Sequence, residues 1–237
     1  MEIGRPVAAT EVRWPEGLHL GELVSEHDGE ITQPSFGMPA VFGGMSSLVP
    51  TLHDVDRGYV MTIDQLDLFG RASEWTVGKV AGAAAQLDAE TPCDAWVVRD
   101  LLSHMLETQR YFVASAQGRE ASPPSPTPTT AVGDDPVAEF EQARTNTLHT
   151  FGQAGVIDKT GPSLGIAFSD QLLHGWDLAR ATGQDETMPA GLPEAAYEII
   201  HGRFTDEQRK GVFKPEVAVA ADASAQEKLL AYTGRTS

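Results

Sequence analysis

The stretch FSDQLLHGWDLARATG, from Phe168 to Gly183, constrains the fold of this chain more than any other. It reads as a helix that ends at Gly183, a residue suited to a left-handed C-terminal cap. At about 100° per residue, Asp170, His174 and Asp177 fall within an arc of roughly 60°. The neighbours of that arc are apolar, and a helix normally turns such residues toward the core. They are Ile166, Ala167, Leu173, Leu178 and Ala181.

Two carboxylates and an imidazole are therefore expected to point inward. Buried charge is unfavourable unless it is paired, hydrogen-bonded or bound to a metal. Asp170 and His174 are four residues apart, so both side chains can reach one cation from the same helix face. The alternative is a core histidine hydrogen-bonded to one aspartate, and this helix by itself favours that alternative.

Charge and cysteine content narrow the class of protein. The formal net charge of −17 opposes binding to nucleic acid or to an anionic membrane. No apolar run has the length needed to span a bilayer, and no signal peptide is recognisable. Cys93 is the single cysteine, which excludes an internal disulfide and a zinc site with several cysteines. We expect a cytoplasmic protein.

Helical periodicity is visible in three further long segments. The first runs from about Met61 to Ala85 and opens with the pair Thr62 and Gln65, which fits a capping box. The others are Val98–Gln117 and a segment from Pro136 to Phe151 with Asp135 as its N-cap.

The connection between the second and third helices is long and rich in proline, from Ser122 to Gly133. Antiparallel neighbours usually need only a few linking residues, so this length predicts a crossover between two parallel helices. Shorter helices are expected over 194–203 and from Ser224, which with Glu227 forms a capping box.

Three parts of the chain follow from these patterns. Residues 1–60 are rich in glycine and proline, show no helical period and need not belong to the native fold. Residues 61–183 form the helical bundle. Residues 184–237 form a C-terminal extension with short helices.

Three segments together resemble a known family. They are TPCDAWVVRDLLSHMLETQRYF from Thr91 to Phe112, DQLLHGWDLARATG from Asp170 to Gly183, and DASAQEKLLAYTGR from Asp222 to Arg235. The first two resemble the signature segments of the mycothiol-dependent maleylpyruvate isomerase N-terminal, metal-binding family, which belongs to the DinB/YfiT-like superfamily. The third resembles the tail of a short actinobacterial branch of it.

The resemblance implies an all-α fold, a DinB/YfiT-like four-helix bundle with up-down-down-up topology. It also implies a divalent metal, with zinc preferred, bound by His104, Asp170 and His174. Three such ligands leave coordination positions open, as catalytic sites do. Asp177 and Asp100 would then orient the ligating imidazoles. The alternative for both is surface charge or helix capping, and for Asp100 the alternative is favoured.

Two departures from the family pattern are visible, and only the first bears on this site. The carboxylate on the last helix of the bundle is usually glutamate, and the shorter Asp170 stands here. Val97 occupies a position that often carries a Ser, Thr or Asp cap. The isomerase has a further C-terminal domain, whereas only a short tail follows Gly183 here, so isomerisation of maleylpyruvate is not expected of this chain.

Three functions remain open on the sequence. The first is a metal-dependent transferase or isomerase that uses mycothiol as cosubstrate and acts on a small electrophile. The second is a metal or small-ligand binding protein without turnover, and the third is a bundle without metal that acts through protein contacts. No residue is assigned to catalysis, and Cys93 is a poor candidate nucleophile. Substrate, native metal and oligomeric state, including a homodimer, are left undetermined.

Overall fold

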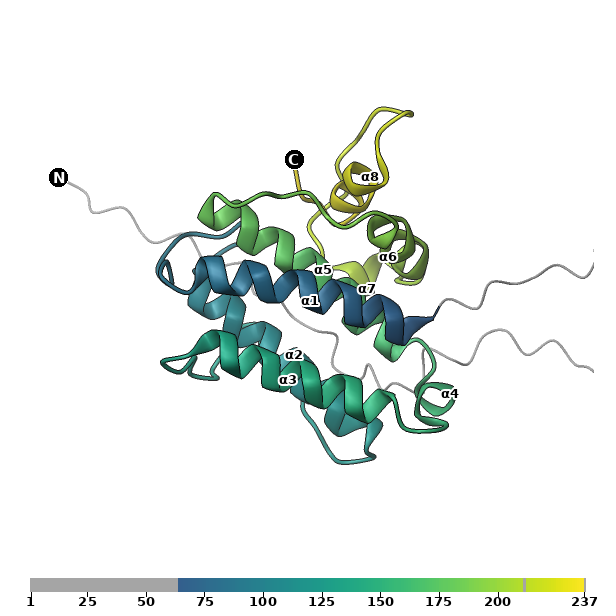
Figure 1. Cartoon of the computed structure of the whole chain (residues 1–237). Helices are drawn as coiled ribbons and strands as arrows, with labels where there is room; N and C mark the ends of the chain where they lie inside the picture. The colour runs from purple at the N-terminus through teal and green to yellow at the C-terminus, as the bar shows by residue number, and fades with distance from the viewer. Residues whose placement is uncertain (1–63, 211, 237) are drawn as a thin grey trace, which may run out of the picture.

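A computed structural model describes residues 64–210 and 212–236 of the chain (Figure 1). The expectations for residues 1–60 lie outside this range. The described helices are α1 (Gln65–Ala83), α2 (Val98–Ala116), α3 (Pro136–Phe151), α4 (Val156–Thr160), α5 (Ser163–Thr182), α6 (Leu192–Ile200), α7 (Asp206–Arg209) and α8 (Ala225–Tyr232). Within the described residues, the only β-structure consists of isolated bridges between Glu90 and Val97 and between Lys210 and Phe213. The predicted all-α class is confirmed.

The long helices α1, α2, α3 and α5 form a bundle in which α2 and α3 run in the same direction (Figure 1). Thr147 of α3 contacts Gln109 of α2, and further along both segments Thr150 of α3 contacts Gln117, the residue that follows α2. Contacts that advance together along both helices require parallel axes. The proline-rich connection therefore returns the chain to the starting end of α2, as its length led us to expect, while α1 and α5 run the opposite way (Figure 1).

Helix α5 is the centre of this arrangement. Its Phe168, Leu172 and Trp176 are almost completely buried, in one apolar cluster with residues from α1, α6 and α8. Gly175 lets α1 approach closely, because a Cβ atom there would lie 2.6 Å from side-chain atoms of Trp75 and Thr76. The helix ends at Gly183, which has a φ of +68°, as predicted, but it begins at Ser163, five residues before the predicted start.

Several helix starts follow the predicted capping chemistry. Asp135 caps α3 by accepting a hydrogen bond from Ala138 N–H, and Pro136 occupies the first turn. The Ser224 and Glu227 side chains form the predicted capping box of α8.

The start of α1 differs from the prediction. Its N-cap is Asp64, whose carboxylate accepts the backbone N–H groups of Leu66 and Asp67, whereas the predicted cap, Thr62, lies outside the described residues. The short helices α4 and α7 were not predicted, since four or five residues are too few to show a period.

The described part of the C-terminal extension packs onto the bundle. Leu192 and Ile200 of α6 and Leu229 and Tyr232 of α8 belong to the same apolar cluster as Phe168 of α5. The extension thus shares its core with the bundle.

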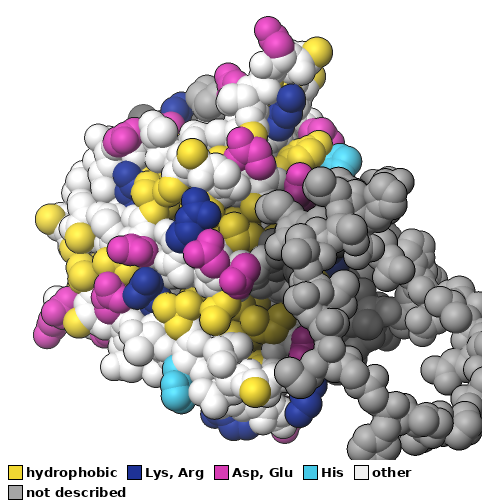
Figure 2. Space-filling view, turned by 45° about the vertical axis from the view of Figure 1, so that its right-hand side comes forward, with side chains coloured by type: hydrophobic (Ala, Val, Ile, Leu, Met, Phe, Trp, Pro, Cys, Tyr) yellow, Lys and Arg dark blue, Asp and Glu magenta, His cyan; other side chains and the backbone are white. Residues whose placement is uncertain are grey.

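Charged side chains of both signs are mixed on the surface. On the face shown in Figure 2, acidic side chains alternate with Lys and Arg and with apolar patches. Among the described residues, no helix is long and apolar enough to cross a bilayer.

Candidate metal centre

The three predicted ligands come together between α2 and α5. His104 lies on the buried face of α2, and Asp170 and His174 lie one turn apart on α5. One ligand atom from each of the three side chains lies within 4.8 Å of the other two. His104 is only 2% exposed, so this convergence takes place inside the protein.

The distances in this cluster fit a shared cation. Asp170 Oδ1 is 3.5 Å from His104 Nε2 and 3.4 Å from His174 Nε2. Hydrogen bonds between nitrogen and oxygen are usually about 2.7–3.2 Å long. Two ligand atoms that each lie about 2.0–2.1 Å from one tetrahedral ion are about 3.3–3.4 Å apart. The donor set of two imidazoles and a carboxylate is also one that zinc-like ions accept.

The second nitrogen of His174 is held by a carboxylate. His174 Nδ1 lies 2.9 Å from Asp177 Oδ2, and Asp177 is completely buried. A proton on Nδ1 in this hydrogen bond leaves the Nε2 lone pair directed toward Asp170 and His104. A carboxylate behind a ligating histidine fixes both the tautomer and the ring orientation. Asp177 is therefore close enough to His174 Nδ1 to hold the ring in one orientation.

Asp177 is in turn held by Arg235, near the end of the chain. Arg235 Nε donates to Asp177 Oδ1 over 2.9 Å, and Arg235 Nη2 donates to Oδ2 over 2.7 Å. The Cys93 thiol lies 3.3 Å from the same Oδ2 atom. Sequence analysis missed this role of Arg235, because nothing in the local pattern near the C-terminus points to α5.

Asp100 lies in a different environment. Its carboxylate accepts a hydrogen bond from Val97 N–H over 3.1 Å at the start of α2. Its contacts among the described residues include none with His104 or His174. This carboxylate satisfies the N–H group of the N-cap residue, as the acidic member of a capping box does.

Burial and charge set the protonation of the cluster. Burial opposes the charged form of Asp170, but the charge of His174 and the closeness of both imidazoles hold the pKa of Asp170 below its usual range. Burial also opposes protonation of His174, yet Asp170 outweighs it and raises the pKa of His174 well above its usual value. For His104, burial prevails and lowers the pKa. Without a metal, His174 thus carries the proton and His104 is neutral.

The Cys93 thiol is not activated by its neighbours. Burial, followed by the charge of Asp177, raises its pKa above the usual value. The thiol therefore stays protonated at neutral pH. A protonated thiol is a weak nucleophile.

A cavity of about 520 Å³ opens onto the three ligands. Trp96 forms part of its wall, and its ring centroid lies 4.8 Å from that of His104. The opposite wall comes from the C-terminal extension and includes Ile200, Phe204 and Phe213. A largely apolar cavity with a few converging polar groups is the usual form of a small-molecule site.

The fold and this cluster define a class, the DinB-like helical bundle with a candidate metal centre between two of its helices. Residues 69–156 match the family profile of the mycothiol maleylpyruvate isomerase N-terminal domain. This part of the chain is therefore similar to that domain, which agrees with the resemblance noted from the sequence. The match includes His104 but ends before Asp170 and His174. The evidence for these two residues therefore comes from the geometry of α5 and not from the profile.

Two relatives are uncharacterized proteins of Mycobacterium tuberculosis, from strains CDC 1551 and H37Rv. Each is 28% identical over 190 residues, which cover 73% of this chain and 99% of the relative. No solved structure gives a significant match.

Proposed function

We propose that His104, Asp170 and His174 bind one divalent metal, with zinc preferred, and that the centre serves a mycothiol-dependent transfer or isomerisation on a small electrophile. The observation that carries this proposal is the approach of Nε2 atoms from two helices to the same oxygen of Asp170, at 3.5 and 3.4 Å. The shorter side chain of Asp170, in place of glutamate, still reaches both imidazoles.

The residues around the centre suit such a reaction. A divalent metal bound there would stabilise the thiolate form of a coordinated thiol. Three protein ligands leave room for that thiol. The apolar wall keeps water from the reacting groups, and Asp177 holds His174 in the orientation that ligation needs. The thiol itself is inferred from the printed name of the matched family. We propose no particular substrate.

Metal analysis of the purified full chain, followed by a zinc titration against a competing chelator, tests the centre. We expect about one metal ion per chain and its loss in His174→Ala. His149→Ala, which removes an exposed histidine on α3, is the matched control and should keep the metal. Equal metal content in His174→Ala and the wild type would refute the ligand set.

Turnover is tested by adding mycothiol to the metal-loaded protein and following thiol consumption with a panel of electrophiles. We expect consumption that requires metal and is absent in His174→Ala. If the protein binds metal tightly but consumes no thiol, the proposed enzymatic function is wrong and the chain is a metal-binding protein.

A further inference from the structure

The C-terminal segment after α8 turns back into the metal centre. Gly234 makes this turn with a φ of +77°, a conformation that favours glycine, and its α-carbon packs against Lys214 and Pro215. The Arg235 side chain, only 13% exposed, then reaches Asp177 on α5. The last described residues thus end against the helix that carries two of the three ligands.

Arg235 is the cation that pairs with the buried carboxylate of Asp177, through hydrogen bonds of 2.9 and 2.7 Å. Among the described contacts of Asp177, the other partners are His174 and the Cys93 thiol. Removing the charged partner of a buried carboxylate strongly destabilises the folded protein. The two parallel hydrogen bonds from Arg235 also fix the plane of the carboxylate. That plane sets the direction in which Asp177 holds the imidazole of His174.

We propose that Arg235 is a positioning residue for the metal centre, and that metal binding and docking of residues 225–236 strengthen each other. The inference rests on the proposed function, since it requires a metal at the three ligands. The chain of contacts runs from Arg235 through Asp177 to His174 without a gap, at 2.7 and 2.9 Å. By thermodynamic linkage, a segment whose docking raises metal affinity is itself held more tightly when metal is bound.

The docked segment also completes the cavity. Thr233 and Arg235 line it, together with Lys214, which contacts Gly234. Release of the segment would open the cavity on the side away from α2. Metal occupancy would therefore control how well the cavity is closed.

Zinc affinity of the full chain, measured by chelator competition, tests the positioning role. Arg235→Lys keeps the charge but loses the paired hydrogen bonds, and we expect affinity to fall about 10- to 100-fold, the range known for partners behind a ligating histidine. The matched control is Arg144→Lys on α3. Arg144 also bonds across helices, to Ser73 and Gly70 of α1, and this variant should stay within about twofold of wild type.

A double-mutant cycle with Asp177→Asn separates positioning from a general loss of stability. If Arg235 acts through Asp177, the Arg235→Lys substitution should change zinc affinity little in the Asp177→Asn background. Independent, additive losses would overturn the proposed route.

Hydrogen exchange of the wild type with and without zinc tests the coupling and needs no variant that might fail to fold. The amides of Gly234 and Arg235, bonded to Ala231 and Leu230, should exchange at least several-fold more slowly with zinc, while α3 stays unchanged. If zinc does not bind the wild type, the proposed metal centre fails. If zinc binds but neither these amides nor the Arg235→Lys affinity change, only the present inference fails.

Discussion

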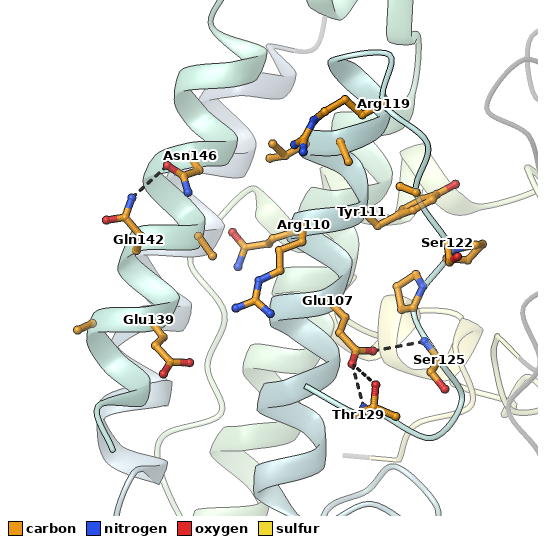
Figure 3. A pocket seen from close by; sticks show the side chains of 18 residues that line it. Glu107, Arg110, Tyr111, Arg119, Ser122, Ser125, Thr129, Glu139, Gln142 and Asn146 are labelled. Atoms are coloured by element: carbon orange, nitrogen blue, oxygen red, sulfur yellow. Dashed lines mark hydrogen bonds between the residues drawn. The ribbon is translucent and has the colours of Figure 1, made fainter. Parts of the chain in front are cut away.

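Helix α2 borders two hollows that differ in chemistry more than in size. On one side lies the cavity of about 520 Å³ with the candidate metal centre. On the other, α2, α3 and the proline-rich connection enclose a wider hollow of about 930 Å³ (Figure 3). The wider hollow is the less promising site, because its carboxylates are already hydrogen-bonded to backbone N–H groups.

The carboxylates of the wider hollow are already occupied. Glu107 points from α2 to the connection, where it accepts hydrogen bonds from the N–H groups of Ser125 and Thr129 (Figure 3). It also accepts one from the N–H group of Thr130. Burial opposes its ionisation, but these hydrogen bonds prevail and lower its pKa. Gln142 and Asn146 of α3 bond to each other. These polar groups hold the connection and α3 in place.

In the smaller cavity, by contrast, ligand atoms face one another at distances too long for good hydrogen bonds. The other ring nitrogen of His104, Nδ1, is buried and has no hydrogen-bond partner among the described residues. Volume alone therefore does not identify a site, whereas ligand atoms that converge without saturating one another do.

The largest effect is expected when substitutions on the two sides of α2 are compared by their zinc affinity. His104→Ala removes the only ligand that α2 supplies, and zinc affinity should fall by more than about 100-fold, beyond the range for outer partners. Arg110→Ala, on the side of α2 that lines the wider hollow, should leave zinc affinity unchanged. Chelator competition measures both, and similar losses in the two variants would contradict the assignment.

The second-largest effect is expected from pH: lowering the pH should weaken zinc binding. The pKa of His174 is raised, so the metal must displace its proton at neutral pH. Zinc affinity should rise by about tenfold per pH unit up to the pKa of His174 and level off above it. A titration series from acid to neutral pH measures this slope. A flat profile over that range would mean that His174 is not a ligand.

A smaller effect is expected when Asp170 is returned to the residue usual in the family. Asp170→Glu keeps the charge and adds one methylene group, so zinc affinity should be retained or should rise. Asp170→Asn, of nearly equal size but without charge, should lower it clearly. Equal affinities in the two variants would show that the carboxylate does not contact the metal.

The smallest effect concerns the wider hollow. Glu107→Gln keeps the side-chain length but weakens its charge-assisted bonds to the connection, so the free energy of unfolding should fall by about 0.5–1.5 kcal/mol. Denaturant unfolding measures this loss, and zinc affinity serves as the control that should not change. A variant that loses zinc while keeping its stability would reverse the roles we give the two hollows.

The sequence by itself determined the all-α class, the extent of α2 and α3, and the face of α5 that carries Asp170, His174 and Asp177. These features depend on local signals, namely helical periodicity and capping residues, which act over a few positions. The length of the proline-rich connection also indicated parallel α2 and α3, because chain length limits where a connection can reach.

Only the tertiary structure decided which side chains meet Asp177 and how Asp100 is used. Arg235 is 58 residues from Asp177, and no periodicity relates two positions so far apart. The role of Arg235 depends on the packing of α8 against α6 and on the turn at Gly234. The early start of α5 at Ser163 has the same origin. Gly165, a weak helix former, lies where the side chain of Ile199 on α6 approaches it within 3.3 Å of a Cβ position, and this packing outweighs its local preference.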